Sequence, residues 1–206
     1  VYRDGPGALY GLEGPVYYTM GRMFDDAENN RAQDLVNEFC GAAFGKAASH
    51  MLRFYERLYH GIELYSEFLG TRCPAWAYHD ISGRRRKYLT NPFQLLGFLY
   101  TPALLDSLEE SLALAERAGD TDKVKTRLAL VRREFDYLKS LARVVHLYHA
   151  YQVQPDRGSH NRLLDAIDAR NAAIADYYGE RGRTKPLAGW AYTMFPIPGH
   201  SEEHLR

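Results

Sequence analysis

The chain has 206 residues, of which 46% are hydrophobic and 25% are charged, so it carries enough apolar side chain to bury a core. Lys plus Arg and Asp plus Glu number 26 each, and this zero formal charge argues against a general nucleic-acid binder, which normally has a basic excess. No apolar run approaches the roughly 18 residues that a membrane-spanning helix needs, so we expect no membrane span.

The cysteine content excludes two kinds of site. Cys40 and Cys73 are the two cysteines of the chain, too few for a disulfide framework or a thiolate metal site. A single bridge between them and two buried thiols both remain open. The chain starts at Val1 without the basic and apolar regions of a signal peptide, from which we expect a fragment or the mature segment of a longer protein.

Hydrophobic residues recur at helical spacing in nearly every periodic segment, and no convincing strand alternation occurs. We therefore predict an all-α fold, an irregular bundle of about six helices in a single domain over residues 1–206. Residues 1–13 are rich in glycine and are predicted to form an N-terminal loop. Pro15 suits the first turn of a helix, where its missing N–H costs nothing, so the first helix is predicted from there to about Phe24.

A carboxylate pair, Asp25 and Asp26, follows that helix. Paired carboxylates can divide the roles of acid and base, but neighbours in sequence rarely face each other. Asp25 with Glu28 has the spacing of a capping box, and Asn29 and Asn30 are alternative caps. We therefore predict that the pair is a hinge that caps the second helix, and not a catalytic dyad.

Two helices are predicted next, over residues 31–45 and 47–70, each ending at a glycine. The apolar stripe of the first comprises Leu35, Val36, Phe39, Cys40 and Ala43. The apolar stripe of the second comprises Met51, Phe54, Tyr55, Leu58, Ile62, Tyr65 and Leu69.

Residues 71–91 form the one long irregular stretch, and loops of this length often carry function. Aromatic faces stack on sugars or bases, and arginines bind carboxylates or phosphates through paired N–H groups. The candidate ligand contacts in this loop are Trp76, Tyr78, His79, Arg84, Arg85 and Arg86. The alternative, which we slightly favour, is a solvated basic loop that pairs with the acidic helix around Glu109 and Glu110.

Two prolines mark the next helix starts. Pro92 opens a short apolar helix, and Thr101 followed by Pro102 has the N-cap and N1 pattern of another helix. That second helix is predicted over residues 101–119 and carries one apolar face. The face comprises Leu105, Leu108, Leu112 and Ala115.

The clearest periodicity lies in a long predicted helix from about Asp122 to Tyr151. Its apolar residues are spaced alternately four and three apart, which is typical of a long helix packed in a bundle. They are Val124, Leu128, Val131, Phe135, Leu138, Ala142, Val145 and His149. After a break at residues 154–159, a final helix is predicted to end at Gly179, and residues 180–206 to form an extended aromatic tail. The apolar residues of that final helix are Leu164, Ile167, Ile174 and Tyr178.

His146 and His149 are three residues apart on the long helix, a spacing that can hold one metal ion. His60 joins them if the two helices pack together, but the sequence fixes no further ligand. A histidine on an apolar stripe is more often a core residue that hydrogen-bonds a neighbour. We favour that interpretation over a metal site.

Glycine-rich phosphate loops, a GxSxG elbow and a catalytic Cys/His pair are all absent from the sequence. We therefore predict no catalytic residue and no cofactor in this chain, and a non-enzymatic role for the chain by itself.

A step from Gly14 to Pro15 leads into a tyrosine-rich helix, and an "FGKAA" step precedes a helix that contains Met51 and Tyr55. This pattern, over the first third of the chain, resembles the helical region that follows a glycoside-hydrolase-like (β/α)8 barrel in large, mostly uncharacterised bacterial proteins. The α-glucuronidases share this outline. Where the family usually has Trp and Pro in the turn between the first two helices, this chain has Phe24 and Asp26.

The resemblance implies a non-catalytic accessory domain that packs on a sugar-processing barrel of the same polypeptide and lends side chains to its carbohydrate-binding cleft. It also implies a secreted or periplasmic protein. The catalytic carboxylates of such relatives lie on the barrel, so none is carried over to this chain. An accessory domain of this kind is expected to expose an apolar patch where the barrel would sit.

Two other classes of function remain alternatives. One is a free-standing helical module for protein interaction or homodimerisation, which would use the tail at residues 180–206 or the long helix. The other is a small metal-dependent enzyme that uses His60, His146 and His149.

Overall fold

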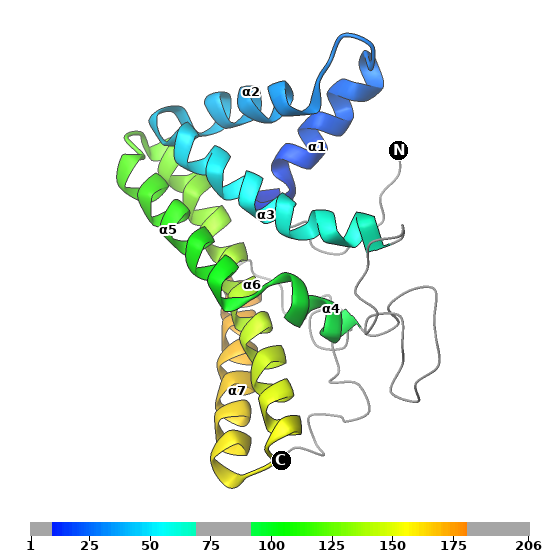
Figure 1. The fold of residues 1–206 in the computed structure, drawn as a ribbon. Helices are drawn as coiled ribbons and strands as arrows, with labels where there is room; N and C mark the ends of the chain where they lie inside the picture. Colours follow the sequence, from blue (N-terminus) through cyan, green and yellow to red (C-terminus); the bar gives the residue numbers. More distant parts are fainter. Residues whose placement is uncertain (1–9, 69–91, 181–206) are drawn as a thin grey trace. The chain divides into compact units, whose positions relative to one another are not determined.

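The computed structural model describes the backbone of residues 10–68 and 92–180 and the side chains of residues 11–61 and 96–173. Within these ranges the chain is all-α, as predicted, and contains no strand (Figure 1). The helices are α1 (Tyr10–Asp25), α2 (Ala32–Phe44), the short 3-10 helix η1 (Gly45–Ala47), α3 (Ala48–Phe68), α4 (Pro92–Leu99), α5 (Pro102–Ala118), α6 (Asp122–Val153) and α7 (Arg157–Glu180).

Two predicted segments fall outside the described ranges. The loop at residues 71–91 lies outside them entirely, and the tail at residues 180–206 lies outside them after its first residue. Among the helices that are described, none is both long and apolar enough to cross a membrane.

Contacts between Cα atoms divide the chain into two compact units. The N-terminal unit comprises Ala8–Ile62 and Pro102–Asp136, and so contains α1, α2, η1, most of α3, α5 and the first part of α6. The C-terminal unit contains α4, the second part of α6 from Tyr137 onward, and α7. α6 is one continuous helix that belongs to both units. The division into units therefore does not decide whether residues 1–206 form a single domain, which stays a prediction.

A buried aromatic and aliphatic core holds the N-terminal unit together. Phe54 of α3 meets Phe135 of α6 edge-on, with ring centroids 5.5 Å apart. Tyr55 packs edge-on against Phe54, also at 5.5 Å. These contacts confirm the predicted apolar stripe on the first part of α6 and, up to Leu58, on α3, whereas the side chains of Ile62, Tyr65 and Leu69 lie outside the described residues. The largest fully buried side chains of the unit are Met51, Phe54, Tyr55, Leu108, Leu112, Leu128 and Phe135.

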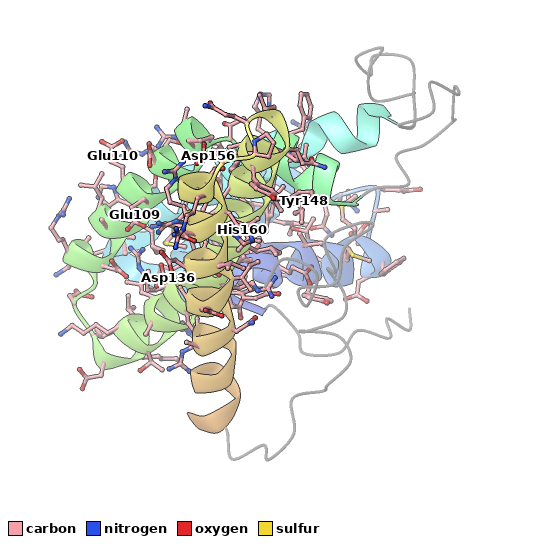
Figure 2. The ribbon with its side chains drawn as sticks, turned by 90° about the horizontal axis from the view of Figure 1, so that it is seen from below. Glu109, Glu110, Asp136, Tyr148, Asp156 and His160 are labelled. Atoms are coloured by element: carbon pink, nitrogen blue, oxygen red, sulfur yellow. The ribbon has the colours of Figure 1, made fainter. Side chains whose placement is uncertain are left out.

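One arginine joins α5 to the first part of α6, which lie side by side in Figure 1. Arg132 donates from Nη1 to Glu109 at 2.6 Å, and from Nε and Nη2 to Glu116 at 2.8 and 2.9 Å. Asp136, one turn further along α6, lies 3.5 Å from the same guanidinium. Figure 2 labels Glu109 and Asp136. The hydrogen bonds from Arg132 to Glu116, and then to Glu109, raise the pKa of the guanidinium, which is therefore charged at every accessible pH.

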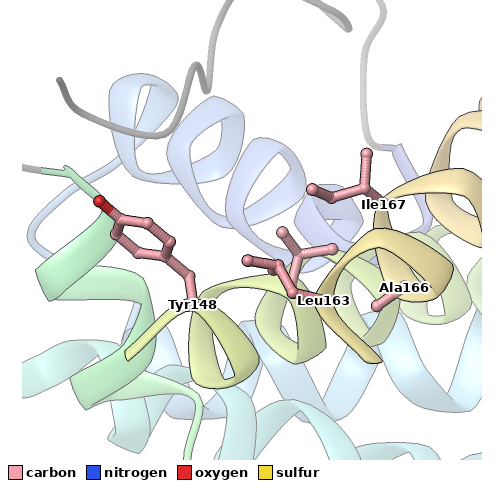
Figure 3. Close-up of a cluster of buried hydrophobic side chains, with 5 residues drawn as sticks. Tyr148, Leu163, Ala166 and Ile167 are labelled. Atoms are coloured by element: carbon pink, nitrogen blue, oxygen red, sulfur yellow. The ribbon is translucent and has the colours of Figure 1, made fainter. Parts of the chain in front are cut away.

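In the C-terminal unit, α7 runs back along the second part of α6 (Figure 1). A hydrophobic cluster forms their contact (Figure 3), and its buried members are Val144, Tyr148, Leu163, Ala166 and Ile167. Ala142 and Val145, which belong to the predicted stripe of the long helix, are also buried. The second part of α6 therefore buries two faces, because α7 covers a side that the predicted stripe does not include.

Several helix boundaries follow the predicted chemistry. Pro92 and Pro102 are the first residues of α4 and α5. Gly45 follows α2 with a φ of 52°, in the left-handed region that glycine tolerates best, and so ends the helix as predicted.

The start of α7 lies inside the predicted break at residues 154–159. The N–H of Ser159 donates to Asp156 Oδ1 at 2.8 Å, and the N–H of Asp156 donates back to Ser159 Oγ at 3.1 Å. This exchange is a capping box, which satisfies N–H groups that the first turn of a helix leaves free. The helix can therefore begin at Arg157, earlier than its apolar residues alone indicate.

The start of α1 also differs from the prediction. α1 begins at Tyr10, so the last part of the predicted loop at residues 1–13 is helical and Pro15 lies inside the helix. A proline there removes the N–H that would bond to the carbonyl of Gly11 one turn earlier. The fold tolerates this because a tyrosine of α3 donates to that carbonyl instead, in the contact described below.

Replacing Leu163 with alanine should lower the free energy of unfolding by about 3 kcal/mol, because the side chain is fully buried in the α6–α7 cluster and its truncation leaves a cavity. Leu164, the next residue, is only partly buried against the cluster, and its alanine variant is a matched control that should lose distinctly less. Urea unfolding of both variants measures the difference. Equal losses would contradict the assignment of this cluster as the core of the unit.

Candidate functional site

Three hydrogen bonds hold the backbone of Gly11 and Leu12 in the first turn of α1. Tyr55 Oη donates to the carbonyl of Gly11 at 2.6 Å, and Tyr59 Oη donates to the carbonyl of Leu12 at 2.9 Å. The two tyrosines lie four residues apart on α3, so both reach the same point. From α6, Glu134 Oε2 accepts the N–H of Leu12 at 2.8 Å. We call Tyr55, Tyr59 and Glu134 the α1 anchor.

Two of the three bonds replace bonds that the helix cannot make for itself, whereas the Leu12 carbonyl accepts from Tyr59 on α3. Leu12 lies in the first turn, where a backbone N–H has no carbonyl four residues earlier, and the carboxylate of Glu134 suits this positive end of the helix. Gly11 would normally bond to the N–H of residue 15, but Pro15 has none. The anchor therefore satisfies backbone groups whose burial without a partner would be costly.

The anchor requires a glycine at position 11. A Cβ atom built on Gly11 would lie 2.9 Å from Glu134 Oε2 and 2.9 Å from the Cα of Val131. The Val131 atom belongs to the backbone and cannot rotate away. A Cβ atom on Gly14 would similarly lie 2.9 Å from the ring of Phe39 on α2. α1 therefore docks with its backbone, and not only its side chains, against the rest of the unit.

Burial keeps the hydroxyl groups of the anchor protonated. Desolvation is the main cause that raises the pKa of Tyr55 and of Tyr59 above the ordinary value of 10.0, so both remain hydrogen-bond donors at neutral pH. Burial also raises the pKa of the nearby Cys40 thiol to about 12, with the charge of Glu56 as the second cause. Cys40 is thus a buried thiol with little thiolate character, and Cys73 lies outside the described residues.

The two halves of α1 differ in exposure. Leu12 and Pro15, in the first half, are buried. Towards its end the helix exposes Met20 at 41% and Phe24 at 66%. These two side chains are four residues apart and so lie on the same side of the helix. We call Met20 and Phe24 the α1 face.

The carboxylate pair at the end of α1 builds a turn. Asp26 accepts the backbone N–H of Asn29 at 3.2 Å and its side-chain amide at 2.9 Å. Asn30 donates to the carbonyls of Asp26 and Arg22 at 2.6 and 3.1 Å, which closes the C-terminal end of α1. The hydrogen bond from the Asn29 side chain lowers the pKa of Asp26, whereas a catalytic acid needs a raised pKa.

The predicted cap of the second helix was therefore wrong. Arg31, and not Asp25, Asn29 or Asn30, stands at the start of α2, and its side chain makes no capping hydrogen bond. The pair does lie at the junction of the two helices, with Asp25 as the last residue of α1, but the hydrogen bonds of Asp26 and its neighbours serve the turn and the end of α1.

His146 and His149 make structural contacts within the C-terminal unit. Nε2 of His146 lies 2.8 Å from the carbonyl oxygen of Tyr100, so this nitrogen carries the proton and donates. His149 packs on α4, where a Cβ atom at Gly97 would lie 3.1 Å from its ring. Burial, and then the nearby His146, lower the pKa of His149 below its ordinary value of 6.5.

The predicted metal site gains no support from these positions. His60 belongs to the N-terminal unit, whereas His146 and His149 belong to the C-terminal unit. Over the residues with described side chains, no group of three His, Cys, Asp or Glu residues is arranged to hold a metal ion.

The predicted ligand contacts in the long loop all lie outside the described residues. They are Trp76, Tyr78, His79, Arg84, Arg85 and Arg86. The alternative placed this loop against Glu109 and Glu110. Glu109 binds Arg132 of α6, which shows one partner of that carboxylate but leaves both interpretations of the loop as predictions.

The α1 anchor was not among the predicted sites, although one signal for it exists. Glu134 precedes Phe135 and follows Val131 by three residues, so it falls on the apolar side of α6, where a charged residue requires a buried partner. The acceptors of Tyr55 and Tyr59 give no such signal, because they are backbone carbonyls far away in sequence.

No protein-family model, curated protein or solved structure matches the chain. Its function therefore has to be inferred from the residues and contacts described above.

The lowered pKa of His149 predicts a loss of stability in mild acid. The unfolded state takes up this proton near pH 6.5, whereas the folded state resists it, so stability falls as the pH falls from 6.5 towards the folded-state pKa. His149→Gln should remove this part of the pH dependence. The free energies of unfolding of the chain and the variant, compared between about pH 8 and pH 5.5, provide the measurement. Identical pH dependence of the two proteins would contradict the prediction.

Proposed function

We propose that this chain is a non-catalytic helical domain that packs on another domain through the α1 face. The observation that carries this proposal is the exposure of Met20 at 41% and Phe24 at 66% on one side of one helix. Scattered exposed apolar residues are common, but neighbouring ones on a single face are typical of an interaction surface.

The composition of α1 strengthens this proposal. Three glycines and one proline within the helix all disfavour helical structure, so ordering α1 carries a cost of several kcal/mol relative to alanine, at about 1 for each glycine and about 3 for proline. The first half of α1 offsets that cost by docking on the core. The second half projects Met20 and Phe24 into solvent, which gains nothing for the isolated chain. A partner that covers the α1 face would explain why the helix continues this far.

The finer form of the proposal names the partner. The resemblance of the stretch around Gly14, Pro15 and Tyr55 to the region that follows a glycoside-hydrolase-like barrel suggests that the partner is such a barrel in the same polypeptide. In that form the parent protein is carbohydrate-active and secreted or periplasmic, and this domain borders its cleft. This finer form rests on the resemblance, whereas the packing role rests on the α1 face.

Self-association through the same two side chains is the rival proposal. A homodimer would cover Met20 and Phe24 with a second copy of the chain. The two proposals differ in a simple measurement, because a homodimer shows a mass that rises above 23.6 kDa with concentration. A mass that stays at 23.6 kDa across the concentration range excludes it.

Replacing both Met20 and Phe24 with serine tests the packing role. In the chain alone the substitutions should change the free energy of unfolding by less than about 0.5 kcal/mol, because both side chains are already exposed. In the protein made from the full reading frame, the same variant should lose about 2–4 kcal/mol, because two apolar side chains would leave a buried contact.

Arg22→Ser provides a control on an exposed position of the same helix turn. It should have a small effect in both proteins. The proposal fails if the double variant loses as little in the full-length protein as in the chain alone. It also fails if the full reading frame encodes no further domain.

A further inference from the structure

We propose that α1 is an arm that folds only when it docks on the α1 anchor, and that it undocks and unfolds as a unit while the rest of the N-terminal unit stays folded. This inference concerns the chain by itself and does not depend on the proposed packing role.

The first argument is that α1 is a poor helix on its own. Gly11, Gly14, Pro15 and Gly21 are four of its 16 residues, and all four disfavour helical structure. Isolated helices of about this length are marginal in water even with favourable sequences. Because proline also removes one internal hydrogen bond, α1 depends on the rest of the unit for its order.

The second argument is that the docking contacts are concentrated in the first part of the helix. The α1 anchor holds residues 11 and 12. Tyr18 then donates to Glu38 at 2.6 Å and packs on Phe39 with ring centroids 5.8 Å apart. Beyond Tyr18, Met20 and Phe24 are exposed. Breaking one set of contacts near the start of α1 therefore releases most of the helix.

The third argument is that the unit has core contacts that do not involve α1. Phe54 of α3 packs on Phe135 of α6, and Leu108 and Leu112 of α5 are fully buried. These contacts join three other helices. The exposed turn at residues 26–31 connects α1 to α2 and provides a place where the chain can bend. Segments with few buried apolar contacts are the ones that open locally before the whole protein unfolds.

Docking thus couples two surfaces. When α1 is docked, the α1 face is presented on an ordered helix and the polar groups of Tyr55, Tyr59 and Glu134 are covered. When α1 undocks, the face loses its helical arrangement and those polar groups are uncovered. A molecule that binds the ordered α1 face would shift the population towards the docked state by its difference in affinity for the two states.

Hydrogen exchange of the full chain, followed by mass spectrometry in increasing low concentrations of urea, tests this inference. Amides of α1 should exchange through an opening that depends only weakly on urea, because little surface is exposed. Amides of α5 between Leu108 and Ala115 should exchange through a strongly urea-dependent opening. If the amides of both helices share one strongly urea-dependent opening, α1 unfolds only with the whole unit and the inference is overturned.

The double variant Tyr55→Phe/Tyr59→Phe removes both hydroxyl donors and keeps both rings. Exchange of the α1 amides should accelerate by about tenfold for each lost hydrogen bond. Exchange of the α5 amides should accelerate as well, because the larger opening through which they exchange also includes undocking of α1. Tyr148→Phe is the matched control, because it removes a hydroxyl that accepts from Gln152 in the C-terminal unit. It should leave α1 exchange unchanged.

No acceleration in α1 would overturn the inference. If the double variant does not fold, the urea dependence of the unmodified chain still decides the question. Neither measurement requires the partner of the α1 face. The experiments therefore distinguish a failure of the proposed packing role from a failure of the proposed undocking of α1.

Discussion

The buried carboxylate of Glu134 is the constraint on which the docking of α1 depends. Glu134 is only 1% exposed. A buried carboxylate is costly unless hydrogen bonds replace those that it made to water. The N–H of Leu12 provides such a bond only because α1 begins at Tyr10, which places Leu12 in the first turn. Gly11 then has to be glycine, because α6 lies too close for a Cβ atom. The position of Pro15 inside the helix follows from the same early start.

The sequence predicted most of the helices because their signals are local. The alternating spacing of Val124, Leu128 and later residues located α6, and Gly45, Pro92 and Pro102 marked three boundaries. The predicted start of α1 was wrong for a physical reason. The rule that places a proline at the start of a helix considers only its neighbours in sequence. Here the lost N–H is compensated by Tyr55, which lies on another helix. The extra buried face of α6 was likewise missed because α7 creates it.

The candidate site could be predicted only in part for a related reason. The cluster of aromatic and sulfur-containing side chains around Met20 and Phe24 is evident in the sequence, but which of them the core leaves exposed depends on where α1 docks. The interpretation of the carboxylate pair also changed, because Asp26 stabilises a turn and does not cap α2. The α1 face therefore lies on a helix whose start is fixed by the α1 anchor and whose end is available for another surface.

Arg132 illustrates how much a single side chain can determine at a surface. Three carboxylates, those of Glu109, Glu116 and Asp136, share its guanidinium. Lysine is usually regarded as a conservative replacement, but its ammonium group is a compact point charge and cannot bind two carboxylates through separate edges of a planar fork. In an orthologue with lysine at this position, the three carboxylates would lie close together, and the lysine would compensate their mutual repulsion less well. We would then expect one of the acids to be replaced as well, so that the residues at these four positions change together across species.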